Sequence, residues 1–477
     1  MSQRHERQEL KKSLNMKDIL ALAFGTMIGW GWIMLAGKWV DAAGVLGAVL
    51  AFGFGAILCI FVGLTYAELT PALPMAGGEL VFSYRGLGFN LSWVTGWMIT
   101  FAYIGVAAWE GPALATAIEF LFGDTLPKGV ILWNIAGFDV TSTFLIIGAL
   151  GGLVLAFVNY RGAKASAIFQ TAATLAMTLG GLAFLFGGVV KGDLENMIPL
   201  MTDGKGFVAV ILMVPAMFVG FDVIPQAAEE MNIPLNKIAK VLIISICMAA
   251  IWYMLMIFSI AISAPAAIRG GARIPVADSF AYCMGNPVFG KLMIIAAMCG
   301  ILTSWNGFIV GGTRVLFSMG RAKMIPEIFA KVHPKYKSPV AAVILVGIIT
   351  CTSPLLGKGA LVWFVNASAF GTVIAYLMVA CSFISLRIRE PELERPYKIR
   401  GGIPVGIIAV VVALFFLSLY LPIYSPSPLV GIEWALVGGW IILGAVLYII
   451  KGLKNKAENV SKGDIEYLMF GDEYKRF

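Results

Sequence analysis

The chain has 477 residues, of which 59% are apolar and only 13% are charged, and its mean hydropathy is +0.88. Soluble domains usually carry about 25% charged residues, so this composition excludes a soluble globular protein. It also excludes a disordered chain and a disulfide scaffold, because the six cysteines lie within apolar runs. The sequence therefore predicts an integral membrane protein.

Few residues are available for metal or cofactor chemistry. The cysteines lack CxxC spacing, and the two histidines, His5 and His333, both lie in polar flanks. Zinc and haem sites need clusters of such ligands. We therefore expect no metal site and no cofactor. The polar segment 1–17 precedes many further apolar runs, which is not the pattern of a cleaved signal peptide.

In chain order, twelve apolar runs are bounded by charged or Pro/Gly-rich breaks, and a bilayer core needs roughly 20 apolar residues per helix. The runs cover residues 18–36, 43–70, 91–122, 143–160, 165–190, 207–228, 238–263, 287–317, 339–357, 360–386, 403–423 and 432–450. The sequence thus predicts an all-α integral membrane protein with about twelve transmembrane helices.

The positive-inside rule tests this number of crossings, because Lys and Arg resist translocation and gather on the cytoplasmic side. With the N-terminus inside, one face holds 27 of the 35 basic residues and the other face holds eight. An error in the number of crossings would distribute the basic residues over both faces. Their concentration on one face therefore favours both termini on the cytoplasmic side of a plasma (inner) membrane. The net charge of +8 then needs no nucleic-acid partner.

Four acidic side chains fall within the runs, where an ionisable group is costly and usually faces a cavity or a partner. Glu68 and Glu119 lie near run ends and can reach polar surroundings, so Glu110 and Asp222 are the buried candidates. Glu110 is either a counter-charge for a substrate amine or a proton carrier, or a protonated carboxyl bonded to a neighbouring helix. Asp222 is either a functional carboxylate or a cap for the helix that follows.

Two runs contain helix-breaking residues near mid-membrane depth. The first has glycines at 25, 29 and 31, each costing about 1 kcal/mol against Ala in a helix interior, and the sixth combines Pro215, Gly220 and Asp222. These runs are five apart, which is the offset expected for inverted repeats of five helices. Paired interruptions of this kind point to a transporter binding site, because unwound backbone offers free N–H and C=O groups. Close packing of small residues is the alternative interpretation.

Four ordered motifs carry a resemblance to a known family. They are G-T-M-I-G-W-G at 25–31; Y-A-E-L at 66–69 with Pro74 and Gly77-Gly78 after it; G-F-D at 220–222 with A-E-E-M-N-I-P at 228–234; and R-V-L-F-S-M-G-R at 314–321 with Ile325-Pro326 and V-H-P at 332–334 after it. Together they resemble the amino acid–polyamine–organocation (APC) superfamily over most of the chain.

The resemblance implies the leucine-transporter fold, with two inverted repeats of five helices whose first and sixth helices are broken. It also implies secondary active transport by alternating access. The expected divisions are a cytoplasmic N-tail (1–17), the first repeat (18–190), the second repeat (207–388), two peripheral helices (403–450) and a cytoplasmic C-tail (451–477). The C-tail either docks on the cytoplasmic face or is disordered.

In such relatives the substrate carboxylate lies on N–H groups of the broken first helix, and the amine lies on carbonyls of the first and sixth helices. This agrees with the preference of half-helix starts for anions and of unwound carbonyls for cations. Carried over to this sequence, with the two buried acids added, the substrate-binding candidates are Thr26, Ile28, Gly29, Trp30, Gly31, Glu110, Phe218, Val219, Phe221 and Asp222.

Several positions depart from the family pattern. Trp30 replaces a usually small residue, and Trp32 replaces an aliphatic one, so these two side chains and Phe218 form either an aromatic cage for an ammonium group or ordinary packing. Ala216 stands where some relatives have a gating tryptophan, which leaves Phe218 or the first run to close the site. Met177 falls where proton-coupled members often have a lysine, and this argues against a lysine-based proton mechanism.

Two sets of polar residues outside the breaks also have possible structural or binding roles. In the loop after the sixth run, Glu229 and Glu230 are expected to order the chain by pairing with basic residues of the segment 161–164. Thr303, Ser304 and Asn306 form either a sodium site with hard oxygen ligands or polar contacts between helices.

The leading hypothesis is a permease for an amino acid or a related organic amine, driven by a coupled proton or sodium ion or by exchange. Two buried acids without a buried lysine favour a polyamine, a basic amino acid or an amino alcohol similar to ethanolamine, while a neutral amino acid stays open because an acid can be protonated. No HExxH, GxSxG or His/Cys constellation suggests an enzyme. A non-transporting nutrient sensor is the alternative from another class, and the short tails argue against it.

Overall fold

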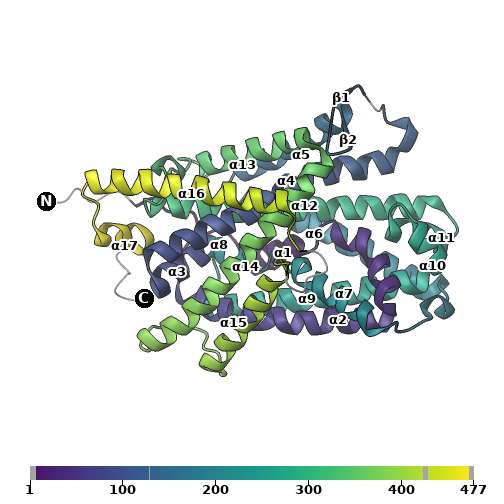
Figure 1. Ribbon diagram of the computed structural model, residues 1–477, viewed down its shortest axis with the longest axis horizontal. Helices are drawn as coiled ribbons and strands as arrows, with labels where there is room; N and C mark the ends of the chain where they lie inside the picture. The colour runs from purple at the N-terminus through teal and green to yellow at the C-terminus, as the bar shows by residue number, and fades with distance from the viewer. Residues whose placement is uncertain (1–6, 128, 423–427, 472–477) are drawn as a thin grey trace.

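The computed structural model describes residues 7–127, 129–422 and 428–471 as a bundle of long helices with one small β hairpin (Figure 1). His5, Lys128, Tyr474 and Phe477 lie outside the described residues. The helices are α1 (Met16–Met27), α2 (Gly31–Ala72), α3 (Glu79–Leu87), α4 (Phe89–Phe122), α5 (Ser142–Tyr160), α6 (Ala163–Lys191), α7 (Gly204–Met217), α8 (Val223–Gln226), α9 (Leu235–Ser263), α10 (Ala266–Gly271), α11 (Pro275–Met284), α12 (Pro287–Arg321), α13 (Val340–Thr352), α14 (Gly357–Arg389), α15 (Gly402–Ser418), α16 (Gly431–Ala457) and α17 (Lys462–Phe470).

Short 3₁₀ turns and the hairpin fill the connections between these helices. The turns are η1 (Gly123–Thr125), η2 (Leu194–Met197), η3 (Ala228–Glu230), η4 (Glu327–Ala330) and η5 (Ser353–Leu356). Strands β1 (Ile131–Ile135) and β2 (Phe138–Thr141) pair antiparallel between α4 and α5. We call the end of the bundle that carries the strands the hairpin end. The opposite end, where the Arg7 Nε donates a hydrogen bond to the Leu468 carbonyl, is the terminal end.

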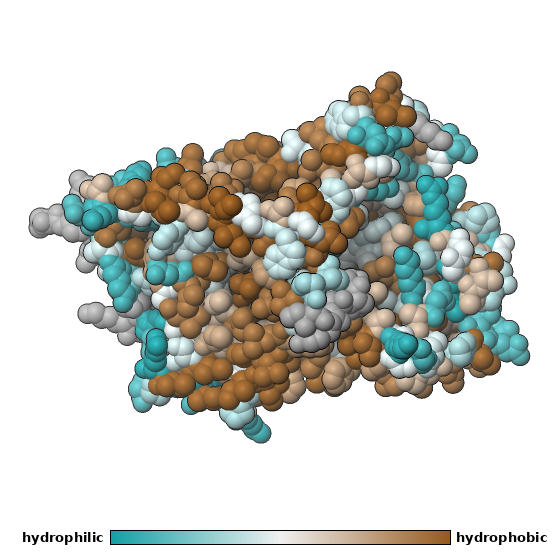
Figure 2. All heavy atoms as spheres, in the orientation of Figure 1, coloured by the Kyte–Doolittle hydropathy of each residue, from teal (hydrophilic) through white to brown (hydrophobic). Residues whose placement is uncertain are grey.

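The twelve apolar runs are helical but do not match the helices one for one, because run 18–36 covers α1 and the start of α2, and run 207–228 covers α7 and α8. The helices have the character of membrane spans. Within the described residues, eight helical segments are long and apolar enough to cross a membrane, and α7 and α15 are shorter apolar helices. Figure 2 shows hydrophobic residues over the sides of the bundle and hydrophilic ones gathered at its two ends. On α5, for example, Ile146, Leu153 and Phe157 are more than half exposed. Such a surface needs an apolar solvent, so the protein is a multi-pass membrane protein.

The first predicted helix break is present and falls at the glycine run. Helix α1 ends at Met27 and α2 begins at Gly31, so residues 28–30 are not helical. The Met27 carbonyl at the end of α1 accepts a hydrogen bond of 2.9 Å from the Tyr253 hydroxyl of α9. This bond gives the helix end a partner that its own backbone cannot supply.

The second predicted break separates α7 from α8. Helix α7 ends at Met217, two residues after Pro215, and α8 begins at Val223. Gly220 lies between them with φ of +129°, a conformation that residues with a β-carbon avoid. Pro215 and Gly220 therefore account for the interruption of the helix after α7.

Side chains at the terminal end tie the two tails to the bundle. Helix α17 docks there, with Met469 and Phe470 buried and the Phe470 ring 6.1 Å from the ring of Tyr84. Of the two expectations for the C-tail, docking holds for the described part up to residue 471.

Glu68, near the end of α2, is fully buried, although we expected it to reach polar surroundings. Its carboxylate forms ion pairs with Arg387 and Arg395 and accepts a hydrogen bond of 2.8 Å from the Ile399 N–H. The two arginines thus take the place of water around this charge. They also fix the loop that joins α14 to α15 against α2.

We expect Glu68→Gln to lower the free energy of unfolding by about 3 kcal/mol, because it leaves two arginines without their buried partner. Lys164→Met is the matched control, since Lys164 is half exposed and its ion pair with Asp18 contributes about 0–1 kcal/mol. Denaturant unfolding of the purified protein in detergent measures both. Equal stability losses for the two variants would contradict this account of Glu68.

Candidate functional site

The two helix breaks lie against each other in the middle of the bundle. A β-carbon placed on Gly220 would be 2.9 Å from the Met27 nitrogen and 3.0 Å from the Thr26 carbonyl carbon. Only a residue without a side chain permits this approach of two backbone segments. The unwound segments 28–30 and 218–222 therefore form one site.

Some backbone groups in both breaks have no hydrogen-bond partner among the described residues. The Ile28 N–H donates to the Phe24 carbonyl, but among the described residues the N–H groups of Gly29 and Trp30 have no acceptor. Across the gap, the carbonyls of Gly220 and Phe221 accept from residues of α8. No donor within the described ranges reaches the carbonyls of Phe218 and Val219. The first break thus offers two free donors, and the second break offers two free acceptors.

Helix ends add partial charges of matching sign to these free groups. Trp30 and Gly31 lie at the N-terminus of α2, and Phe218 follows the C-terminus of α7. The helix dipole makes the first position favourable for an anion and the second for a cation. The site therefore suits a small molecule that carries both charges close together.

Glu110 of α4 borders the first break. Its Oε1 accepts a 2.5 Å hydrogen bond from the Ser304 hydroxyl of α12, and its Oε2 has no partner. A β-carbon on Gly29 would be 3.1 Å from the Ser304 Oγ and 3.6 Å from the Glu110 Oε1. The carboxyl thus bonds a neighbouring helix, as one interpretation expected, and keeps one oxygen for a ligand, as the other requires.

Asp222 holds the shape of the second break. Its Oδ2 accepts from the Tyr103 hydroxyl at 2.6 Å, and its Oδ1 accepts from the Gly220 N–H at 2.8 Å and from the Tyr376 hydroxyl at 3.4 Å. The side chain makes no hydrogen bond to the first turn of α8, so it is not the helix cap that was one expectation. Three protein donors surround this carboxylate, and they make it a positioning group for the loop.

The aromatic side chains of the breaks pack on separate partners. Trp32 meets Trp252 edge to face at 5.4 Å, and Phe218 lies 5.9 Å from Tyr253. Phe221 lies 5.4 Å from both Tyr66 and Tyr376. In the described part of the chain, no ring contact joins Trp30, Trp32 and Phe218, so the geometry favours ordinary packing over an aromatic cage.

Two further candidate residues serve packing. The Thr26 hydroxyl donates to the Leu22 carbonyl at 2.5 Å, and a β-carbon on Gly307 would lie only 1.8 Å from it. The carbonyl oxygen of Ile28 approaches Gly300 in the same way, at 3.1 Å from a β-carbon there. Glycines of α12 therefore bring this helix against the first break.

The residues considered for sodium make contacts between and within helices. Asn306 donates to Gln170 and accepts from Asn159 and Ser166, at 2.8 to 3.0 Å. Thr303 donates to the Gly300 carbonyl, while Ser304 donates to Glu110. These contacts are the polar helix–helix contacts of the alternative interpretation.

Sequence reasoning missed Glu79, a fully buried carboxyl at the start of α3. Gln226 of α8 donates a hydrogen bond to its Oε2, whereas its Oε1 has no partner. Glu79 lies between two apolar runs in a segment of mixed polarity, so a search of apolar runs passes over it. An acid next to the Gly77-Gly78 turn was the available signal.

At the terminal end, backbone and side-chain contacts close the bundle below the breaks. The N–H groups of Ser13 and Leu14 donate to the Glu230 carbonyl at 2.8 and 3.0 Å. Glu230 pairs with Arg314, and Glu229 pairs with Arg321, each at 2.8 Å. We call these two ion pairs and the two backbone bonds the latch. The partners of Glu229 and Glu230 come from α12, so the expected pairing with the segment 161–164 was wrong.

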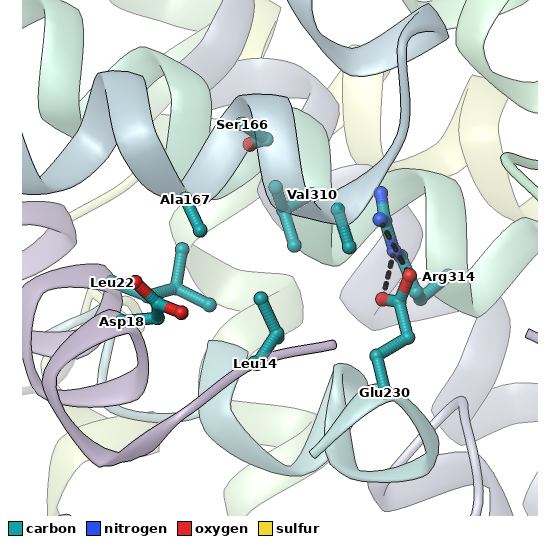
Figure 3. Close-up of a pocket in the computed structure, with 9 residues that line it drawn as sticks. Leu14, Asp18, Leu22, Ser166, Ala167, Glu230, Val310 and Arg314 are labelled. Atoms are coloured by element: carbon teal, nitrogen blue, oxygen red, sulfur yellow. Dashed lines mark hydrogen bonds and ion pairs between the residues drawn. The ribbon is translucent and has the colours of Figure 1, made fainter. Parts of the chain in front are cut away.

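A cavity of about 10 Å³ lies beside the latch, and it has room for a single water molecule. Figure 3 shows Leu14 pointing into it between side chains of α6 and α12, next to the Glu230–Arg314 pair. This cavity is too small for an amino acid, and the contacts of the latch surround it.

Burial alone would raise the pKa of Glu229, but Arg321, Arg7 and the Ala76 N–H lower it to about 2. A carboxyl whose pKa is depressed on folding stabilises the protein above its unfolded value, near 4.3, and loses this contribution as the pH falls through about 2. Glu229 therefore stays charged throughout the physiological pH range.

We expect Glu229→Gln to loosen the latch, because the variant leaves Arg321 buried without its carboxylate. Hydrogen exchange measured by mass spectrometry should be at least tenfold faster for the N–H groups of Ser13 and Leu14. Glu327→Gln is the control, because Glu327 is 44% exposed and pairs with Lys451 away from the latch. Unchanged exchange in Glu229→Gln would mean that the ion pair does not hold the N-terminal segment.

Comparison with known proteins identifies the family. The family model described as amino acid permease matches residues 14–447. The chain is 30% identical to a branched-chain amino acid permease of Bacillus subtilis over 95% of both chains, and 24% identical to a methylthioribose transporter of the same organism over 96% of this chain and 97% of that one. It is 25% identical to human cationic amino acid transporter 4, over 80% of this chain and 60% of that one. The chain belongs to the amino acid permease family of the APC superfamily, and it is a membrane transporter rather than an enzyme.

Proposed function

We propose that this permease carries an α-amino acid, which binds between the two helix breaks and crosses the membrane by alternating access. The observation that carries the proposal is the pair of unsatisfied backbone sets, the N–H groups of Gly29 and Trp30 and the carbonyls of Phe218 and Val219. The amino acid's carboxylate lies on the first set and its ammonium group on the second. Polar backbone at membrane depth is tolerated where it lines such a site.

The first candidate substrate is an amino acid whose own side chain is neutral and apolar. Ile28 and Phe218 are buried apolar residues of the breaks, and a β-carbon on Gly31 would lie 3.0 Å from the Met217 sulfur. Asp222 is saturated by protein donors, which removes one of the two acids that favoured a cation. The similarity to a protein named as a branched-chain amino acid permease supports this choice.

A cationic amino acid is the second candidate, and the free oxygen of Glu110 favours it. This oxygen belongs to a carboxyl beside the first break and could pair with a side-chain ammonium or guanidinium group. Several similar proteins are named as cationic amino acid transporters. A polyamine or amino alcohol fits less well, because it has no carboxylate for the N–H groups of Gly29 and Trp30.

The arrangement in the membrane is part of the proposal. Twelve crossings, with α1 to α6 and α7 to α14 forming inverted repeats, place both tails in the cytoplasm of a cell whose plasma (inner) membrane holds the protein. The concentration of basic residues on one predicted face supports this orientation. The terminal end is then the cytoplasmic end, and the latch closes the site towards the cytoplasm.

We expect Gly29→Ala to weaken amino acid binding at least tenfold, because the added methyl group meets the Ser304 hydroxyl at 3.1 Å. Amino acid counterflow into proteoliposomes should fall with it. Gly438→Ala is the matched control, since a β-carbon at Gly438 meets nothing within 4 Å. If Gly29→Ala transported amino acids at the wild-type rate, the first break would not be part of the substrate site.

We expect Glu110→Gln to separate the two substrate classes. For a neutral substrate, leucine should raise the melting temperature of wild type and variant alike, because a ligand that binds only the folded protein stabilises it. For a cationic substrate, lysine or arginine should stabilise the wild type, and this effect should fall at least tenfold in apparent affinity in the variant. If no amino acid in a full panel stabilises the wild type or exchanges across proteoliposomes, the proposed function fails and a sensor becomes the better hypothesis.

A further inference from the structure

Buried carboxyls at the terminal end and at the second break fall into two groups according to their partners. Glu68, Glu229 and Glu230 each form ion pairs with arginine. Glu79 and Asp222 are fully buried as well, but in the described part of the chain neither forms an ion pair with lysine or arginine. An uncompensated carboxylate at this depth is costly, so such a group is usually neutral or functional.

The two unpaired acids share one buried polar cluster. Glu79 of α3 and Asp222 act on each other electrostatically, and Tyr66, Tyr103 and Tyr376 from α2, α4 and α14 surround them. Two neighbouring carboxyls without a cation cannot both carry a charge at low cost. The cluster therefore holds a proton on one of them.

The hydrogen bonds decide which acid holds the proton. Asp222 accepts three hydrogen bonds, from Tyr103, Tyr376 and the Gly220 N–H, and these stabilise its charged form. Glu79 accepts one short hydrogen bond, from Gln226, and the Tyr66 hydroxyl is a second, longer interaction of its carboxyl. With fewer donors than Asp222, the charged form of Glu79 is the more expensive of the two, so the proton belongs on Glu79.

Further unsatisfied atoms make this cluster a binding site rather than a packed core. The Gln226 Oε1 and the hydroxyl of Ser83, one turn beyond Glu79 on α3, are buried without a hydrogen-bond partner among the described residues. Buried polar side chains normally have such partners. A protonated Glu79 needs an acceptor, and the unused Gln226 Oε1 is on the side chain that already bonds it.

Glu79 is placed where a proton could control movement. The Gly77 N–H donates to the Gln226 carbonyl at 3.4 Å, and a β-carbon on Gly78 would lie 2.8 Å from the Cβ of Pro225. The start of α3 is thus held against α8, which joins the substrate break to the latch residues. Opening towards the terminal end has to separate α8 from α3 and break the Gln226–Glu79 bond.

We propose that Glu79 is the proton-binding site that couples amino acid transport in this protein to the proton gradient. The inference rests on the proposed function. Glu79 takes a proton from water on the hairpin side while the terminal end is closed, and the neutral carboxyl lets α8 and α3 separate. Water then reaches the carboxyl and accepts the proton as hydronium on the terminal side.

The test uses purified full-length protein in proteoliposomes and two kinds of transport. Counterflow at equal pH exchanges substrate without net proton movement, whereas accumulation driven by an outside-acid pH gradient requires proton release. Glu79→Gln imitates the protonated side chain, so it should keep counterflow within threefold of wild type and lose at least tenfold of the accumulation. Glu79→Asp keeps a carboxyl and should accumulate substrate with a shifted pH profile.

The control variant is Glu119→Gln, which removes a carboxyl near the C-terminal end of α4. It should keep both kinds of transport. If Glu79→Gln does not fold, a pH-sensitive dye inside proteoliposomes with the wild-type protein tests proton coupling instead. Substrate that enters together with protons must acidify the lumen. Wild-type protein that exchanges amino acids without proton movement overturns the inference alone. The same holds if sodium drives accumulation, or if Glu79→Gln still accumulates substrate. Wild-type protein that exchanges no amino acid overturns the proposed function and the inference with it.

Discussion

Within a bilayer, every backbone N–H and C=O group has to find a partner in the protein or line a cavity, and this constraint organises the molecule. The two helix breaks leave groups of both kinds without partners, at Gly29 and Trp30 on one side and at Phe218 and Val219 on the other. Each break also leaves groups of the other kind free, since the carbonyls of Ile28 and Gly29 and the N–H groups of Val219 and Phe221 have no partner among the described residues. A zwitterionic ligand satisfies both sets at once, so the breaks make physical sense as a pair.

The surrounding residues hold the breaks open in defined shapes. The Tyr253 hydroxyl donates a hydrogen bond to the Met27 carbonyl, and the Gly220 N–H donates one to Asp222, so these two backbone groups of the breaks are satisfied by side chains. Gly307 allows α12 to touch Thr26, which leaves no room for α1 to shift towards that helix. The strain of two interrupted helices is thus balanced by contacts from α4, α9, α12 and α14, and those helices form the rigid frame of the site.

Local features of the fold could be predicted from the sequence, and long-range contacts could not. The breaks fell at the predicted glycines and at Pro215 and Gly220, because these residues disfavour a helix wherever they stand. The partners of Glu229 and Glu230 were wrong, since Arg321 and Arg314 lie 92 and 84 residues away. Glu79 was missed because α3 is not an apolar run, and it is buried by packing against α4, α12 and α14. Asp222 was found by its position, but its role depends on tyrosines from two other helices.

The distribution of buried charge follows from what each part must do during transport. Glu68 keeps two arginines and an N–H group together at a junction between α2 and α14 that has no reason to open. The latch pairs join segments that have to separate, and because both pairs are buried, opening has to bring water to each partner. Glu79 lies closer to the breaks than the latch does, and there a charged pair would resist separation. An acid that becomes neutral by binding a proton avoids that resistance, and it makes the opening of the terminal end depend on the proton it carries.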